Sequence, residues 1–323
     1  MSAQSPSLSV TPIQAPPLRA YGVLLLGIAS VTGAAIFIRL ALGEGVPALV
    51  IAAARLVLAT LMLTPFTLRR HLPVLRALRL RDWLLLGVSG VFLAMHFSAW
   101  VSSLQYATVL VSGVLVTTTP IWVGILEVLV LKAKLSRAIV IGLGIALAGS
   151  IIIALPVSIQ ASAVPVSVEI AATVPSQGDL ALLGGGLALL GALTVAVYLI
   201  IGRKYRATMP LLPYIWVVYG TAALVMLGVV AVSGLAVTGY SAEGYWWLLM
   251  LAVFPQLIGH SSFNYALAYL PATYISLSTQ IEPILGAVLA YALFAELPGW
   301  SQMLGSAVVL VGVTWATLKS TTA

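Results

Sequence analysis

Cysteine is absent from this 323-residue chain, and charged residues make up only 7% of it. The first absence excludes disulfides, thiolate metal sites and cysteine nucleophiles. A soluble domain has about a quarter of its residues charged, so the second absence excludes that class. Hydrophobic residues make up 61% of the chain, and several apolar runs reach the roughly 20 residues that span a bilayer as a helix. The sequence therefore predicts an all-α integral membrane protein.

Motifs that bind nucleotides or catalytic metals are also missing. The chain has no Walker A loop, no H-E-x-x-H motif and no dinucleotide-binding glycine fingerprint, so neither ATP-driven transport nor a metal or other cofactor is expected. Gly87-Val88-Ser89-Gly90 formally matches the G-x-S-G of intramembrane serine proteases. Small residues are common in membrane helices because they permit close packing, and no histidine can be assigned to Ser89 from its spacing. An enzyme is therefore not predicted.

The apolar runs predict ten membrane-spanning helices with mostly short connections. We expect a disordered N-terminal tail over 1–18, five helices over 19–155, an outer linker over 156–179, five more helices over 180–318 and a C-terminal tail over 319–323. The linker is rich in Ser, Val, Ala and Pro, which is typical of a flexible segment. The spans are expected at 20–41, 47–68, 82–104, 108–131, 136–155, 180–203, 211–232, 245–268, 273–295 and 299–318.

The basic residues predict the orientation. Thirteen of the 15 Lys and Arg fall in segments on one side of this topology, and none falls in a loop on the other side. Basic loops stay cytoplasmic, so we expect both termini to be cytoplasmic and the protein to lie in the cell (inner) membrane. The net charge of +7 then reflects topology, and no nucleic-acid partner is expected.

An internal repeat relates the two groups of five helices. Tyr106 and Tyr269, Pro120 and Pro283, and Gly149 and Gly312 are each 163 residues apart. Because five spans is an odd number, the second copy is expected to be inverted relative to the first. Inverted repeats with proline-interrupted helices at corresponding positions are typical of secondary transporters, whose sites lie near the membrane midplane.

The order and spacing of several short motifs resemble the EamA-like family of the drug/metabolite transporter superfamily. The resemblance covers nearly the whole chain and rests on Ala53-Ala54-Arg55-Leu56, Ala99-Trp100, Leu104-Gln105-Tyr106-Ala107, Thr119-Pro120, Thr194…Tyr198-Leu199…Arg203, Asn264-Tyr265-Ala266-Leu267-Ala268-Tyr269, Glu282-Pro283, Phe294-Ala295-Glu296 and Gly305…Gly312. It implies ten helices in two inverted repeats. It also implies a carrier of amino-acid-like, nucleobase-like or amphipathic drug-like compounds.

Glu282 is the principal site candidate. It precedes Pro283 in the apolar run 273–295, roughly 14 Å along a helix that starts at Thr273. Gln280, on a neighbouring face, is a candidate for lining the same space. Ionisable residues at such depth usually face a cavity or a partner, so Glu282 is expected to carry a coupling proton or bind a cationic group. A structural carboxylate at the proline break is the alternative. Thr119-Pro120 shares the break but lacks the charge, so Pro120 and Pro283 are interpreted as architecture.

Two histidines are expected near the same plane. His96 lies 14 residues into the third span and His260 lies 15 residues into the eighth, and either could relay protons or bind a carboxylate. A neutral histidine bonded between helices is the alternative, and a metal site is not expected. Trp100 follows His96 by four residues and Asn264 follows His260 by four, so each lies on the same helix face as its histidine. Both are candidates for lining a cavity, as is Tyr198.

Arg55 and Glu127 are two further charged residues inside the predicted spans. Arg55 is expected to pair with Glu44 by snorkelling, to meet Glu282 inside, or to bind an anionic group, with snorkelling or structural pairing favoured. Glu127 is expected to form a local ion pair with Lys132 or Lys134.

These features favour a secondary transporter that moves a small organic metabolite by alternating access. Export and proton coupling are the preferred readings, and an uncoupled facilitator is the alternative. An integral-membrane enzyme would need a nucleophile–base or metal set, and a scaffold would need a sizeable soluble domain; the chain offers neither. The expected partners are the substrate and the lipid bilayer, with the protein acting as a monomer or homodimer.

Overall fold

The computed structural model describes residues 17–106, 109–154, 178–282, 284–285, 289 and 300–320. Within these ranges the regular structure is entirely helical. The elements are α1 (Leu18–Thr32), α2 (Ala34–Gly43), α3 (Ala48–Arg76), α4 (Leu80–Tyr106), α5 (Val109–Val116), α6 (Thr119–Leu131), α7 (Arg137–Ala154), α8 (Gly178–Arg206), α9 (Leu211–Val232), α10 (Ala242–Leu251), the π-helix η2 (Ala252–His260), α11 (Ser261–Ala266), α12 (Ala272–Ser278), the 3-10 helix η3 (Thr279–Ile281) and α14 (Trp300–Ser320).

The helices confirm the predicted class, an all-α membrane protein. Every predicted span contains helix at its expected place. Five helical stretches are long and apolar enough to cross a membrane: Leu18–Gly43, Ala48–Arg76, Leu80–Tyr106, Leu183–Arg206 and Leu211–Val232. Thr119–Leu131, Arg137–Gly149 and Met303–Ala316 are shorter apolar helices. The count of ten complete spans thus stays a prediction. The predicted tail over 1–18 and linker over 156–179 lie almost wholly outside the described residues.

Two spans depart from regular α-helix in ways that the sequence did not predict. The first is divided at Gly33 into α1 and α2, and the eighth contains the nine-residue π-helix η2. Pro255 lies inside η2. Because proline has no N–H to donate to the preceding turn, it favours a local change of winding, and π segments occur frequently at functional sites.

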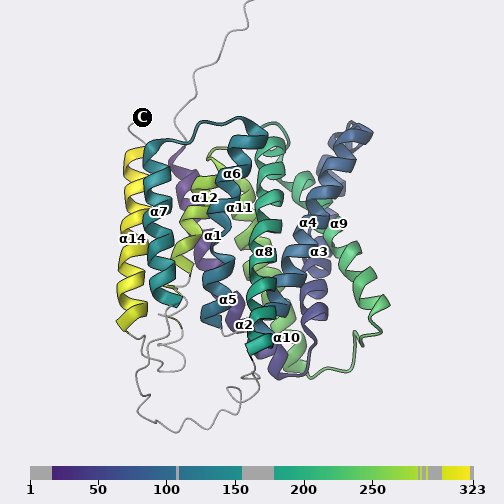
Figure 1. The fold of residues 1–323 in the computed structure, drawn as a ribbon. Helices are drawn as coiled ribbons and strands as arrows, with labels where there is room; N and C mark the ends of the chain where they lie inside the picture. Colours follow the sequence, from purple (N-terminus) through teal and green to yellow (C-terminus); the bar gives the residue numbers. More distant parts are fainter. Residues whose placement is uncertain are drawn as a thin grey trace, which may run out of the picture.

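The helices form one bundle, in which segments far apart in sequence lie side by side. Figure 1 shows α7 and α14 together at one edge and α3, α4 and α9 at the other. The most extensive packing joins α7 to α14, α4 to α8 and α9, α3 to α9, α6 to α8, and α1 to η2 and α11. Each of these contacts links a helix before the 156–179 segment to one after it, so the two halves of the chain are packed together throughout.

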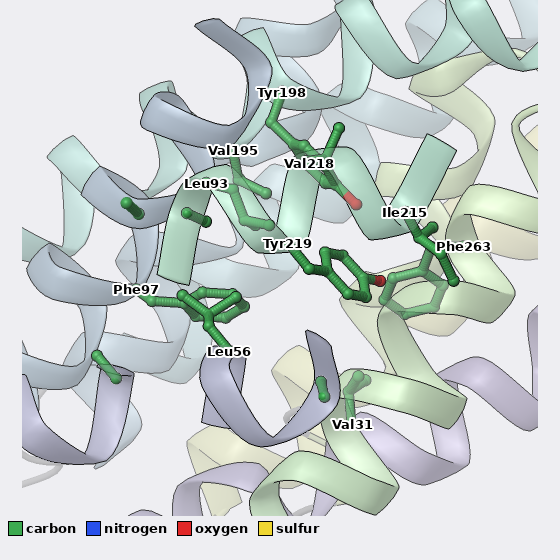
Figure 2. Close-up of a cluster of buried hydrophobic side chains, with 14 of the residues drawn as sticks. Val31, Leu56, Leu93, Phe97, Val195, Tyr198, Ile215, Val218, Tyr219 and Phe263 are labelled. Carbon is green, nitrogen blue, oxygen red and sulfur yellow. The ribbon is translucent and has the colours of Figure 1, made fainter. Parts of the chain in front are cut away.

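A buried cluster of apolar side chains holds the halves together next to the site described below. Figure 2 shows Val31, Leu56, Leu93, Phe97, Val195, Tyr198, Ile215, Val218, Tyr219 and Phe263 converging from α1, α3, α4, α8, α9 and α11. These side chains are each less than a tenth exposed. Such dense packing fixes the helix positions and hence the polar side chains between them.

Glycines permit the close approach of α7 and α14. A Cβ atom on Gly142 would lie 2.6 Å from the carbonyl oxygen of Gly312, and one on Gly149 would lie 2.7 Å from that of Gly305. Gly142 and Gly305, like Gly149 and Gly312, are 163 residues apart. The two contacts are therefore equivalents under the sequence repeat, and they bring the backbones together as small residues do in membrane helix pairs.

We expect Gly142→Ala to destabilise the protein and Gly144→Ala to be neutral or slightly stabilising. Both changes gain the same helix propensity, but a Cβ on Gly144 meets nothing within 4 Å. Overpacking at Gly142 should cost about 1–3 kcal/mol. Thermal unfolding in detergent measures the difference, and equal melting temperatures for the two variants would contradict tight α7–α14 packing.

Candidate functional site

A cavity of about 90 Å³ lies between the helices of both halves. At roughly 30 Å³ per water it has room for about three water molecules, and it is small beside the roughly 300–1,000 Å³ of a drug-sized pocket. The first half contributes Val31, Ala34, Arg55, His96, Trp100, Val116, Thr117 and Thr119, and the second contributes Val195, Tyr198, Leu199, Pro255, His260, Phe263, Ile275, Ser276, Thr279 and Glu282. The site is thus shared between the repeats.

The two histidines predicted near the midplane both line this cavity. Their ring centroids are 6.4 Å apart. His96 Nδ1 donates a hydrogen bond to the carbonyl oxygen of Gly191 at 2.9 Å, because a carbonyl can only accept; this sets the tautomer of His96 and leaves Nε2 without a proton when the ring is neutral. The His96 ring stacks on Trp100, with centroids 6.0 Å apart and planes 11° apart. The structure therefore brings His96, His260 and Trp100 together.

Glu282 lies on the part of the wall formed by α12 and η3. Ser276 and Thr279 line the cavity beside it and donate their hydroxyl protons to the carbonyl oxygens of Thr273 and Ser276, at 3.1 and 2.8 Å. Their remaining lone pairs make this wall rich in hydrogen-bond acceptors. Glu282 is partly buried and makes no ion pair with another described residue. The role of Glu282 in binding a solute or a proton stays a prediction, as does the alternative of a structural carboxylate.

A break between two helices lies just before Pro120, where the sequence predicts one. Helix α5 ends at Val116, two residues of turn follow, and α6 restarts at Thr119 with Pro120 in its first turn, where the missing N–H is tolerated. Pro283 lies outside the described residues. The helix ahead of it changes from α12 to the 3-10 helix η3 over Thr279–Ile281.

The remaining predicted site residues divide into those inside and outside the cavity lining. Tyr198 lines the cavity, whereas Asn264 and Gln280 are buried but do not belong to the lining. Asn264 donates to the hydroxyl of Tyr198 and, at 2.8 Å, to the carbonyl oxygen of His260. Asn264 thus supports two lining residues from behind.

Arg55 also belongs to the site, although snorkelling toward Glu44 was the favoured sequence reading. Its side chain is 0% exposed and lines the cavity. Nε donates to Gln256 Oε1 at 3.1 Å, and the guanidinium carbon lies 3.9 Å from the centroid of the Phe97 ring. Glu44 instead accepts a hydrogen bond from Ser241 Oγ at 2.5 Å. Arg55 is the seventh residue after Ala48, where α3 begins, which places it roughly 10 Å deep. That depth was the signal in the sequence that Arg55 lies inside the bundle.

Glu127 joins the two halves at one end of the cavity. It is 3% exposed, and its carboxylate accepts hydrogen bonds from the backbone N–H groups of Ala272 and Thr273, at 3.0 and 3.2 Å, and from the Thr273 hydroxyl. The predicted local ion pair with Lys132 or Lys134 is wrong. An anion at a helix N-terminus satisfies amides that have no partner within the helix, so Glu127 ties the end of α6 to the start of α12.

Comparisons with known proteins agree with this architecture. The model of the EamA-like transporter family matches residues 18–155 and, a second time, residues 182–318. A solved structure described only as a crystal structure of protein superposes with a TM-score of 0.71 at 17% identity, covering 93% of this chain and 97% of the other. At that identity the likeness concerns the fold alone. No curated protein matches the sequence.

Proposed function

This chain belongs to the EamA-like transporter family and is therefore a membrane transporter. From that premise we propose that it is a secondary carrier that moves a small organic metabolite by alternating access. The observation that carries the proposal is the cavity, whose polar side chains come from both halves of the chain. A binding site at the junction of two repeats can open to either side when the repeats move relative to each other. The cavity is small, so the helix bundle would have to widen to admit a metabolite.

The packing of the helices supports an inverted repeat. Under the 163-residue shift, α4 corresponds to the segment α10–η2–α11, and α8 corresponds to α1–α2. The α4–α8 contact then has its equivalent in the contact of α1 with η2 and α11. The α3–α9 and α7–α14 contacts are each equivalent to themselves. This is the pattern that a pseudo-two-fold axis generates.

The coupling ion of this proposal is a proton, and the direction is export across the cytoplasmic membrane with both termini in the cytoplasm. Glu282, His96 and His260 share the cavity wall, and carboxylate and imidazole side chains inside membrane spans are the types that form proton relays. In the alternative, an uncoupled facilitator, the same residues would bind solute without a proton cycle. No cofactor is assigned, and the protein would work as a monomer or homodimer.

Flux in proteoliposomes tests the proposal. The full-length protein is reconstituted and a panel of amino acids, nucleobases and amphipathic amines is offered with and without a pH gradient. We expect at least one compound to cross faster than in protein-free vesicles, with accumulation that follows the gradient. Flux that ignores the gradient would identify the facilitator, and absence of protein-dependent flux for the whole panel would contradict a metabolite carrier.

A further inference from the structure

Within this proposed function, we infer that Arg55 anchors a carboxylate group of the transported solute. The guanidinium would hold the carboxylate through Nη1 and Nη2, from the position that Arg55 occupies on the cavity wall. The substrate class that follows is an organic acid or zwitterion, as opposed to a purely cationic or neutral compound.

The first argument is that the charge of Arg55 is unbalanced. The side chain is 0% exposed, and among the described residues neither Nη1 nor Nη2 has a hydrogen-bond partner. A buried charge is costly unless it is paired and hydrogen-bonded. Glu282 lines the same cavity, yet the two form no ion pair within the described part of the chain. The guanidinium therefore lacks an anion on the wall of the cavity in which the proposed solute would bind.

The second argument is that the guanidinium is held in place by contacts that leave its terminal nitrogens without a hydrogen-bond partner among the described residues. Nε donates to Gln256 Oε1 at 3.1 Å, and the Phe97 ring lies 3.9 Å below the guanidinium carbon. A planar fork fixed in this way presents two parallel N–H donors, the geometry that binds a carboxylate at both oxygens. Preorganisation of this kind reduces the entropy lost on binding.

The third argument is the surplus of donors around Arg55. Because arginine can only donate, Gln256 must turn its Oε1 toward Arg55 Nε, which leaves Gln256 Nε2 buried without a partner. Trp100 Nε1, on the cavity lining, is also a buried donor without a partner within the described residues. A carboxylate could accept hydrogen bonds from the donors that face the cavity, and it would add the missing negative charge.

A matched pair of probes tests the assignment. Benzoate and benzamide have nearly the same shape, but only benzoate is an anion. Binding of each is measured by calorimetry to the full-length protein in nanodiscs. We expect the wild type to bind benzoate at least about tenfold more tightly than benzamide, as charge-assisted bidentate pairing predicts. Equal affinities would overturn the inference on the wild type alone, without any variant.

Variants assign the preference to Arg55. Arg55→Met keeps an unbranched side chain of similar length and removes a buried charge, a change that such sites often tolerate; the benzoate preference should disappear. Arg55→Lys keeps the charge without the fork and should retain only part of the preference. Arg19→Met is the control, because Arg19 is exposed and does not line the cavity. An undiminished preference in a folded Arg55→Met variant would overturn the assignment.

The binding test and the flux test can fail independently of each other. Protein-dependent flux restricted to neutral or cationic solutes, without benzoate preference, would leave the carrier standing and remove the role of Arg55. Arg55-dependent benzoate binding without flux of any panel compound would leave the anion site standing and remove the carrier.

Discussion

Replacing Glu282 with Gln is expected to leave the protein folded and to abolish the part of solute flux that a pH gradient drives. Glutamine keeps the size and a hydrogen-bonding carbonyl of glutamate but cannot take up and release a proton. Glu282 lines the same cavity as His96 and His260. A proton bound to Glu282 would therefore lie next to a solute bound in that cavity. Ionisable residues at membrane depth mark substrate and ion pathways, and proton relays are one of these.

The measurement compares gradient-driven accumulation with exchange of labelled for unlabelled solute in the same proteoliposomes. In Glu282→Gln we expect gradient-driven accumulation to fall by about tenfold or more, equivalent to ~1.4 kcal/mol or more of lost coupling, while exchange continues. Glu243→Gln is the matched control, because Glu243 is exposed in the first turn of α10 and outside the cavity lining. Wild-type accumulation in a folded Glu282→Gln variant would refute the coupling role.

The class and the helix order could be predicted from sequence because they depend on local composition. Apolar runs of about 20 residues give the positions of membrane helices, and each of the predicted ranges contains helix. The repeat spacing also placed His96 and His260 at one level, and the structure brings their rings to 6.4 Å. In a protein with two symmetric repeats, residues at equivalent positions of the two copies are expected at the same depth, and so they can be neighbours although they are far apart in sequence.

The partners of Arg55 and Glu127 could not be predicted in the same way. Arg55 meets Gln256, 201 residues away, and Glu127 meets Ala272, 145 residues away. Local spacing offered nearer partners of opposite charge, which is why Glu44 and the lysines at 132 and 134 were preferred. In a bundle, a buried charge is satisfied by whichever helix packs against it, and that depends on tertiary packing. The π-winding of η2 likewise depends on Pro255 in its packed setting.

The second large effect is expected from Glu127→Ala, which should destabilise the protein and loosen the contact between α6 and α12. The substitution leaves the backbone N–H groups of Ala272 and Thr273, both buried, without the acceptor that now serves them. Each buried amide left unsatisfied costs about 1–3 kcal/mol. Two such groups together should cost about 2–6 kcal/mol. Glu127→Gln retains one acceptor oxygen and should cost about half as much.

Thermal unfolding and thiol labelling together measure this effect. Glu44→Ala is the control, because Glu44 also bridges distant segments through Ser241 but does so at the surface, where a hydrogen bond contributes only about 0.5–1.5 kcal/mol.

The chain has no cysteine, so a single Ser276→Cys substitution reports access to the cavity one turn beyond the Glu127 contact. In sealed vesicles with the Lys132 loop facing outward, an impermeant thiol reagent should label this cysteine faster when Glu127→Ala is also present. An unchanged melting temperature and labelling rate would show that Glu127 neither stabilises the bundle nor closes that end of the cavity, whereas a lower melting temperature with an unchanged labelling rate would confine it to stability. Faster labelling would identify the Glu127–Thr273 contact, a buried polar contact that joins the two halves of the chain, as a closure that must break for solute to pass.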